Sequence, residues 1–289
     1  MELTEIASGR FFAHLTRPIG VPSSQPFRVR FEAVSVVDAR SGHIVSAHRH
    51  PHYELLYVDA GTYRAVINQG EISAEAGHLV VLKPGDHHAD LCERPVRLRA
   101  VRLRADPGPA PEESRNLFAA DLAPSAQVIE DRDQTISDLI TRLIDEAAAH
   151  RRFAAEILDC VATELMWSIL RRLPSEALEA DLAAGSSDRG FAAELQRLFT
   201  SKQGANLGLH DLAAALGLSE RTLSARCRSL FGQSPTRLFV RHKMDQARVL
   251  VAQTDIPIKE ISAYFGFENP YHFSTVYKRV HGVAPSAHR

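Results

Sequence analysis

Histidines grouped around one carboxylate are the residues of this 289-residue chain best suited to chemistry. His48, His50 and Glu54 stand at alternate positions, so on a β-strand their side chains would share one face. His88 follows a Pro-Gly pair and would arrive from a facing strand. Imidazoles and a carboxylate that converge on one point can hold zinc, iron, manganese or nickel. We therefore predict that His48, His50, Glu54 and His88 bind one divalent metal.

Two alternatives remain open for this cluster. The same side chains can line a metal-free pocket, where they would form hydrogen bonds to a small molecule. His52 shares the strand parity of His48 and His50, and His87 precedes His88. Either could replace a ligand or lie in solvent, so the pattern does not decide which of His50, His52, His87 and His88 are ligands.

The cluster lies in a β-rich part of the sequence. Short apolar or alternating stretches separated by glycine are typical of a small β-barrel or jelly roll. We expect this domain to span residues 1–105, and a proline-rich segment, 106–111, follows it. The expected strands lie within residues 27–37, 53–58, 62–67, 78–82 and 96–104.

Two helices are predicted next, from Thr135 to His150 and from Phe153 to Leu173. The second carries Ile157, Val161, Leu165 and Ile169 at four-residue steps, an apolar stripe that predicts a helical partner. We expect residues 106–173 to be a linker and dimerisation region, and the protein to be a homodimer. Residues 174–189 are small and acidic, which indicates a flexible linker before a domain at 190–289.

Two segments of the last hundred residues share one pattern, in which a short apolar helix, a glycine and a basic helix follow one another. The first runs from Leu209 to Gly232 and the second from Ile258 to Gly282. A glycine at the turn, Gly217 or Gly266, permits the sharp change of direction. This is the pattern of a helix-turn-helix, whose second helix enters the major groove of DNA.

Each second helix begins at a residue that can cap it, Ser219 in the first unit and Asn269 in the second. Residues 235–252 contain no glycine or proline beyond the first position, so we expect a helix that connects the two units. The outward residues of the two second helices are predicted to contact DNA: Arg221, Thr222, Ser224, Ala225, Arg228, Tyr271, Ser274, Thr275, Lys278 and Arg279.

The charge distribution agrees with a DNA-binding C-terminal domain. Residues 190–289 contain thirteen Lys and Arg against seven Asp and Glu, a net charge of +6, whereas residues 1–189 carry −7. A local positive charge attracts the phosphates of double-stranded DNA, and Arg228, Lys278 and Arg279 are placed for this role.

The C-terminal region resembles the DNA-binding domain of the AraC/XylS transcriptional regulators. The resemblance covers Phe191 to Arg289. Ala225 and Thr275 depart from it, because family members usually have a long basic residue at both positions, and this implies an unusual target sequence. The residues that carry the resemblance are Ile258, Ile261, Ser262, Gly266, Phe267, Phe273, Tyr277, Lys278, Gly282, Pro285, Ser286 and Arg289.

The N-terminal region resembles the cupins, a superfamily of small β-barrels. The resemblance rests on two glycine-bounded motifs, Gly42 to Gly61 and Gly77 to His88, which contain the histidine cluster. A cupin is also the common sensor domain of the AraC family. Together the resemblances imply an α+β multidomain protein with a cupin-like barrel, a middle helical pair and an all-α double helix-turn-helix domain. Such a regulator senses a small molecule or a metal and binds DNA, with RNA polymerase as a further candidate partner.

Other classes of protein are disfavoured. No apolar run is long enough to span a bilayer and the N-terminus has no signal-peptide core, so we expect a cytoplasmic protein with no membrane contact. Three widely spaced cysteines indicate neither a disulfide framework nor a cysteine zinc site. The rival hypothesis is a metal-dependent cupin enzyme, such as a dioxygenase or isomerase, with secondary DNA binding. We expect a non-enzyme, because a duplicated helix-turn-helix gives an enzyme no advantage.

Overall fold

The chain divides into two compact units. The computed structural model describes residues 4–7, 10–12, 27–39, 43–106 and 116–289, so Gly42 and the proline-rich residues 107–111 lie outside the described part. One unit spans residues 24–186, and the other contains residues 187–289. Strands β1 (Thr4–Ala7) and β2 (Arg10–Phe12) pair with each other and group with the second unit, unlike the single domain expected over residues 1–105.

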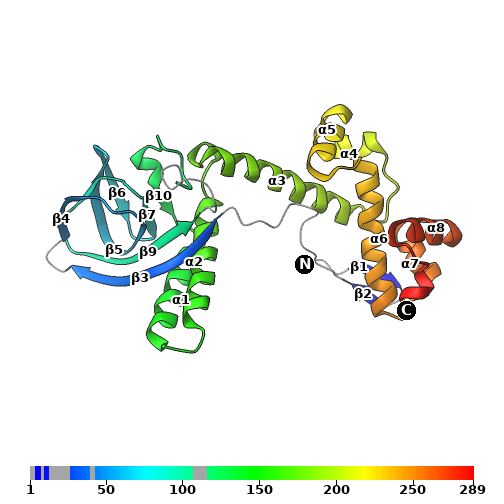
Figure 1. The fold of residues 1–289 in the computed structure, drawn as a ribbon, viewed down its shortest axis with the longest axis horizontal. Helices are drawn as coiled ribbons and strands as arrows, with labels where there is room; N and C mark the ends of the chain where they lie inside the picture. Colours follow the sequence, from blue (N-terminus) through cyan, green and yellow to red (C-terminus); the bar gives the residue numbers. More distant parts are fainter. Residues whose placement is uncertain (1–3, 8–9, 13–26, 40–42, 107–115) are drawn as a thin grey trace. The chain divides into compact units, whose positions relative to one another are not determined.

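Eight antiparallel strands of residues 24–186 form one curled sheet, the expected cupin-like barrel (Figure 1). The long strand β5 organises it, since its first half pairs with β7 and β9 and its second half with β6 and β8. Strand β6 is absent from the sequence prediction, and β4 and β8 are expected only as the strands that carry His48 and His88, because each of the three is short and mixes apolar with charged or histidine residues. The strands are β3 (Arg28–Ala39), β4 (His43–His48), β5 (Tyr53–Ile67), β6 (Gly70–Glu75), β7 (His78–Leu82), β8 (His88–Cys92), β9 (Val96–Asp106) and β10 (Val128–Glu130).

A glycine bends β5 where two separate strands are predicted. Gly61 has a φ of +80°, and a Cβ at this position would lie 2.4 Å from the carbonyl oxygen of Pro95. The pairing of β5 with β9 shifts register just before it, between Val58 and Ala60. The glycine therefore allows a bulge and a close approach of two backbones, and the strand continues through it.

The two faces of the sheet bury different cores. Leu56 and Val58 face the inside of the barrel, together with apolar residues of β6 to β9. Leu55 and Tyr57, at the alternate positions, pack on the outside against two helices. Glu54 has the parity of Leu56, so strand alternation directs its carboxylate to the inner side.

The two helices are α1 (Thr135–Ala149) and α2 (Ala154–Leu170), which confirms both predictions to within three residues at each end. They lie side by side against the sheet (Figure 1). Val161, Leu165 and Ile169 are at most 1% exposed, within the core that α2 shares with the outer sheet face. The expectation that this stripe faces a partner subunit is therefore wrong for these three residues, which cover the protomer's own barrel, whereas Ile157 at the start of the stripe is 37% exposed.

A helix replaces most of the flexible linker expected over residues 174–189. Ser175–Ala177 form a 3-10 turn, and α3 (Ala180–Ser201) begins three residues later. The helix is favoured by its alanine and leucine content, and the Glu179 carboxylate caps it by accepting a hydrogen bond from Leu182 N at 3.2 Å. Small residues here are helix formers rather than signs of disorder.

Five further α-helices follow α3 in the second unit, as predicted. Helices α4 (Leu209–Ala215) and α5 (Glu220–Phe231) make the first helix-turn-helix, and α7 (Ile258–Tyr264) and α8 (Pro270–His281) make the second. Helix α6 (Pro235–Gln253) connects them. Each helix-turn-helix has its own apolar core. Among the described residues no helix is both long and apolar enough to cross a membrane.

Candidate functional site

The helices α5 and α8 present equivalent surfaces. Their exposed, half-buried and buried positions coincide residue by residue over 221–232 and 271–282. The Ser219 hydroxyl accepts a hydrogen bond from Thr222 N at 3.1 Å, and the Asn269 side chain accepts one from Tyr271 N at 2.9 Å. Both predicted caps are thus confirmed, and each fixes the start of a helix whose outer side is open to a ligand.

Eight of the ten residues predicted to contact DNA are exposed. Tyr271 is 85% exposed, which is unusual for so large an aromatic side chain in the absence of a partner. Ser224 and Ser274 are half-buried, and the Ser274 hydroxyl donates to the carbonyl oxygen of Pro270 in its own helix. The exposed residues are Arg221, Thr222, Ala225, Arg228, Tyr271, Thr275, Lys278 and Arg279.

The two helix-turn-helix units are fastened to each other at the second turn. Gly266 has a φ of +77°, and a Cβ there would lie 2.3 Å from the carbonyl oxygen of Gly204 in the loop before α4. The Asn206 side chain donates to the Gly266 carbonyl oxygen at 3.1 Å. The Gln203 side chain also donates to the hydroxyl of Tyr264 at 2.8 Å. These contacts fix the second recognition helix relative to the first.

A buried lysine of α6 completes this junction. The Lys243 ammonium, on a side chain in a residue only 2% exposed, donates to the carbonyl oxygens of Ala205 and Phe265, one from each side of the junction. Burial lowers the pKa of Lys243 to about 8. Its role in joining the units is not visible in the sequence, where it reads as one more surface cation.

The titration of Lys243 should appear in the stability of this domain. Its pKa is lower in the folded than in the unfolded chain, so the unfolded chain holds more protons between pH 8 and 10.5. The free energy of unfolding of wild type relative to Lys243→Met should therefore rise over this range, by at most about 3 kcal/mol. Urea unfolding at several pH values measures it. A difference that does not vary with pH would contradict the assignment.

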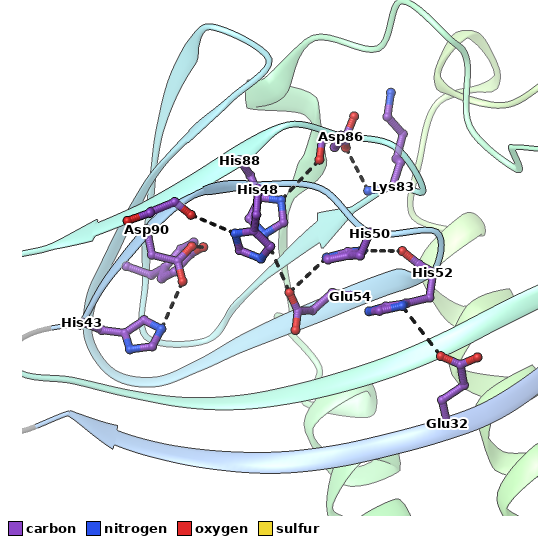
Figure 2. Close-up of polar contacts among 12 residues, drawn as sticks. Glu32, His43, His48, His50, His52, Glu54, Lys83, Asp86, His88 and Asp90 are labelled. Atoms are coloured by element: carbon purple, nitrogen blue, oxygen red, sulfur yellow. Dashed lines mark hydrogen bonds and ion pairs between the residues drawn. The ribbon is translucent and has the colours of Figure 1, made fainter.

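A second candidate site lies in the barrel, where three histidines converge. One ring nitrogen of each of His48, His50 and His88 lies within 4.8 Å of the others. His48 ends β4, His50 lies in the loop before β5, and His88 begins β8, so the expected single strand over His48–Glu54 is wrong (Figure 2). The loop nevertheless brings His50 back to the cluster. Glu54 Oε2 lies 3.3 Å from His50 Nε2 and 3.9 Å from His88 Nε2.

Backbone carbonyls orient all three rings. The Nδ1 atoms of His48, His50 and His88 lie 2.9, 2.8 and 3.3 Å from the carbonyl oxygens of Ser46, His52 and Asp86. A protonated Nδ1 that donates to a carbonyl leaves Nε2 as the free electron-pair donor. Metal-binding histidines are commonly oriented in this way. The donor set and its orientation therefore fit a divalent metal.

The charges of the cluster are unequal. The hydrogen bond to Glu54 is the main cause that raises the pKa of His50, whereas burial lowers the pKa of His88. Burial alone would raise the pKa of Glu54, but the hydrogen bond with His50 and the nearby imidazoles lower it overall. These effects favour the charged forms of His50 and Glu54 and the neutral form of His88.

His52 and His87 lie apart from the convergent nitrogens. His52 stacks on the His50 ring at 4.1 Å, but its Nδ1 faces Glu32 at 3.8 Å (Figure 2). His87 is exposed. The arrangement thus brings His50 and His88 into the cluster and leaves His52 and His87 outside it.

A buried acid beside the cluster is absent from the sequence prediction. Asp90 accepts a hydrogen bond from the Tyr63 hydroxyl at 2.6 Å, and its second oxygen lies 3.0 Å from His43 Nε2. Asp90 follows His88 by two positions on β8, so strand parity alone could have placed it on the same face.

Comparison with known families assigns both units. The AraC-like ligand binding domain matches residues 33–166, and a helix-turn-helix domain matches residues 212–289. The chain belongs to the AraC/XylS family of transcriptional regulators. As an AraC/XylS regulator it pairs a cupin-like ligand-binding domain with a DNA-binding domain, and it is a regulator rather than an enzyme.

Curated relatives of this AraC/XylS regulator match along most of its length. It is 26% identical over 254 residues to the MmsAB operon regulatory protein of Pseudomonas aeruginosa, a match that covers 86% of this chain and 78% of that protein. It is 25% identical over 274 residues to the transcriptional activator RhaR of Escherichia coli, with 89% and 92% coverage. The activator RhaS of Yersinia pseudotuberculosis is 24% identical over 247 residues, with 82% and 86% coverage.

Proposed function

We propose that α5 and α8 read two major-groove segments on one face of the duplex, and that occupancy of the barrel site controls this binding. The matching exposure of the two helices carries the proposal, because equivalent outer faces on a fixed frame suit two successive turns of DNA. Regulation of transcription from such a site brings in RNA polymerase as a partner, by contact or by exclusion from the promoter.

Substitutions on the two helices should separate base reading from phosphate binding. Arg221→Ala should relax sequence preference by about 1–3 kcal/mol at one position, because arginine forms specific contacts with guanine. Lys278→Ala should weaken binding to all sequences alike and lower the salt dependence by about one unit. Selection from a random duplex library by the full-length chain, followed by titration of the selected sequence, measures both. The proposal fails if both variants keep the wild-type footprint and affinity.

The barrel site would hold one divalent metal through His48, His50, His88 and Glu54. The three carbonyl-anchored imidazoles support this part of the proposal. Three neutral imidazoles and one carboxylate leave a single net positive charge on a divalent ion. His48 is exposed, so the cluster is open to solvent on one side. An anionic or hydroxyl-bearing effector could enter there and complete the coordination.

Dimerisation would use the outward face of α2, which includes Ile157 from the predicted stripe but none of its three buried residues. Phe153, just before the helix, is 58% exposed, Ile157 is 37% exposed and Cys160 is exposed. These residues follow one another at steps of four and three, so they form one apolar edge. A second copy of the helical pair is the proposed occupant of this edge.

A further inference from the structure

The DNA-binding domain contains a basic groove between its two helix-turn-helix units. It has a volume of about 920 Å³. The loop before α4 forms one wall, the first three turns of α6 form its floor, and one flank of α8 forms the other wall. Of the residues predicted from the sequence to contact DNA, only Arg279 lines this groove.

Basic side chains line the groove. Its lining includes Arg237, Arg241, Lys243 and Arg279, and no Asp or Glu is among the described lining residues. Lys243 is committed to two backbone carbonyls, but the three arginines are exposed. Arg241 approaches Asp245 only at 3.8 Å, with both side chains more than half exposed, so this pair is weak. The groove is therefore a site for an anion.

The position of the groove relative to the recognition helices α5 and α8 indicates that the anion is the DNA backbone. Arg279 lines the groove and also belongs to the exposed side of α8 that carries Thr275 and Lys278, so the groove opens beside the proposed reading face. A duplex held by α5 and α8 in successive major grooves must cross the space between them. The DNA in that interval offers a minor groove flanked by two phosphate backbones.

We propose that this groove is a third DNA contact, in which Arg237, Arg241 and Arg279 bind backbone phosphates between the two major-groove segments. The inference rests on the proposed reading of DNA by α5 and α8. The apolar side chains of Val240 on the floor and Val276 on the α8 wall can pack against the methylene stems of the arginines while the guanidinium groups reach the phosphates. The contact is independent of base sequence, so it adds affinity and orientation to the specificity of the helices.

The test uses the full-length chain with Arg237→Gln, Arg241→Gln and the double variant. Arg248→Gln is the matched control, since Arg248 is an exposed arginine of the same helix that does not line the groove. Fluorescence anisotropy with one library-selected and one arbitrary-sequence duplex is measured over a salt series. Each groove variant should lower the salt slope by about 0.9 on both duplexes. The affinity advantage of wild type over the double variant should shrink about tenfold from about 50 to about 200 mM salt.

The outcomes separate this inference from the function beneath it. A wild-type chain that binds no duplex would overturn the proposed function itself. If wild type binds and Arg221→Ala loses preference, but the double variant keeps the wild-type salt slope, only the groove contact is wrong. The same holds if Arg248→Gln lowers the slope as much as the groove variants do. Unchanged thermal unfolding midpoints confirm that the exposed substitutions leave the fold intact.

Discussion

Leu165→Glu should unfold the sensor unit, residues 24–186, instead of producing a folded monomer. Leu165 has no exposed surface and lies in the core between α2 and the outer face of the sheet. A carboxylate there would have no partner, so it would either stay charged at a large desolvation cost or be protonated at the expense of stability. The expected loss exceeds about 4 kcal/mol, comparable with the total stability of many domains. Circular dichroism and urea unfolding measure it.

Ile157→Glu is the matched control on the same helix. Ile157 is 37% exposed, so a charge there stays hydrated and the fold should survive. If the outward edge of α2 forms the dimer, this variant should shift sedimentation toward the monomer at an unchanged unfolding midpoint. A cooperative, folded monomer from Leu165→Glu would show instead that the stripe is not part of the core.

Metal binding should disappear when His88 is removed. His88 is 1% exposed and held by its own backbone segment, so no other side chain can take its place without a rearrangement of β8. Full-length protein without a histidine tag should bind about one equivalent of zinc, iron, manganese or nickel, and His50→Ala and His88→Ala should bind less than about a tenth. Elemental analysis after gel filtration is the direct measurement.

The adjacent histidine supplies the control for this experiment. His87 is exposed and outside the cluster, so His87→Ala should retain the metal. Negligible metal in the wild type, after incubation with each of the four ions, would return the cluster to a metal-free polar pocket for a small effector. Equal loss in His87→Ala and His88→Ala would indicate adventitious surface binding.

Local patterns predicted what depends on local chemistry. The caps at Ser219 and Asn269 and the turn glycines hold because each acts within a few residues of itself. The stripe of α2 shows the opposite case. Its four-residue spacing correctly indicates a buried helix face, but spacing cannot say whether a partner subunit or the protomer's own sheet buries it.

The histidine site shows the same division. Residue types identify the cluster, but strand alternation predicts its geometry only for a continuous strand from His48 to Glu54. The strand in fact ends at His48, and β5 begins at Tyr53. His50 reaches the site through a loop. Tyr63 on β5 and Asp90 on β8 lie far apart in the sequence and are brought together by the pairing of these two strands. The basic face of α6 could have been predicted from the sequence, because Arg237 and Arg241 stand four residues apart on a predicted helix and would share one face.

If α5 and α8 read DNA as proposed, the close contact of Gly204 with Gly266 limits which genomic sequences can serve as operators. One inserted base pair between the two half-sites moves the second by about 3.4 Å and rotates it by about 35° around the duplex. Two helix-turn-helix units joined by a flexible linker could follow such a change. The two units of this protein cannot, because contacts at Gly266 and Lys243 hold them in one arrangement. The interval between half-sites thus becomes information in its own right. In a genome of millions of base pairs, a chance pair of matching half-sites at the wrong interval would be passed over.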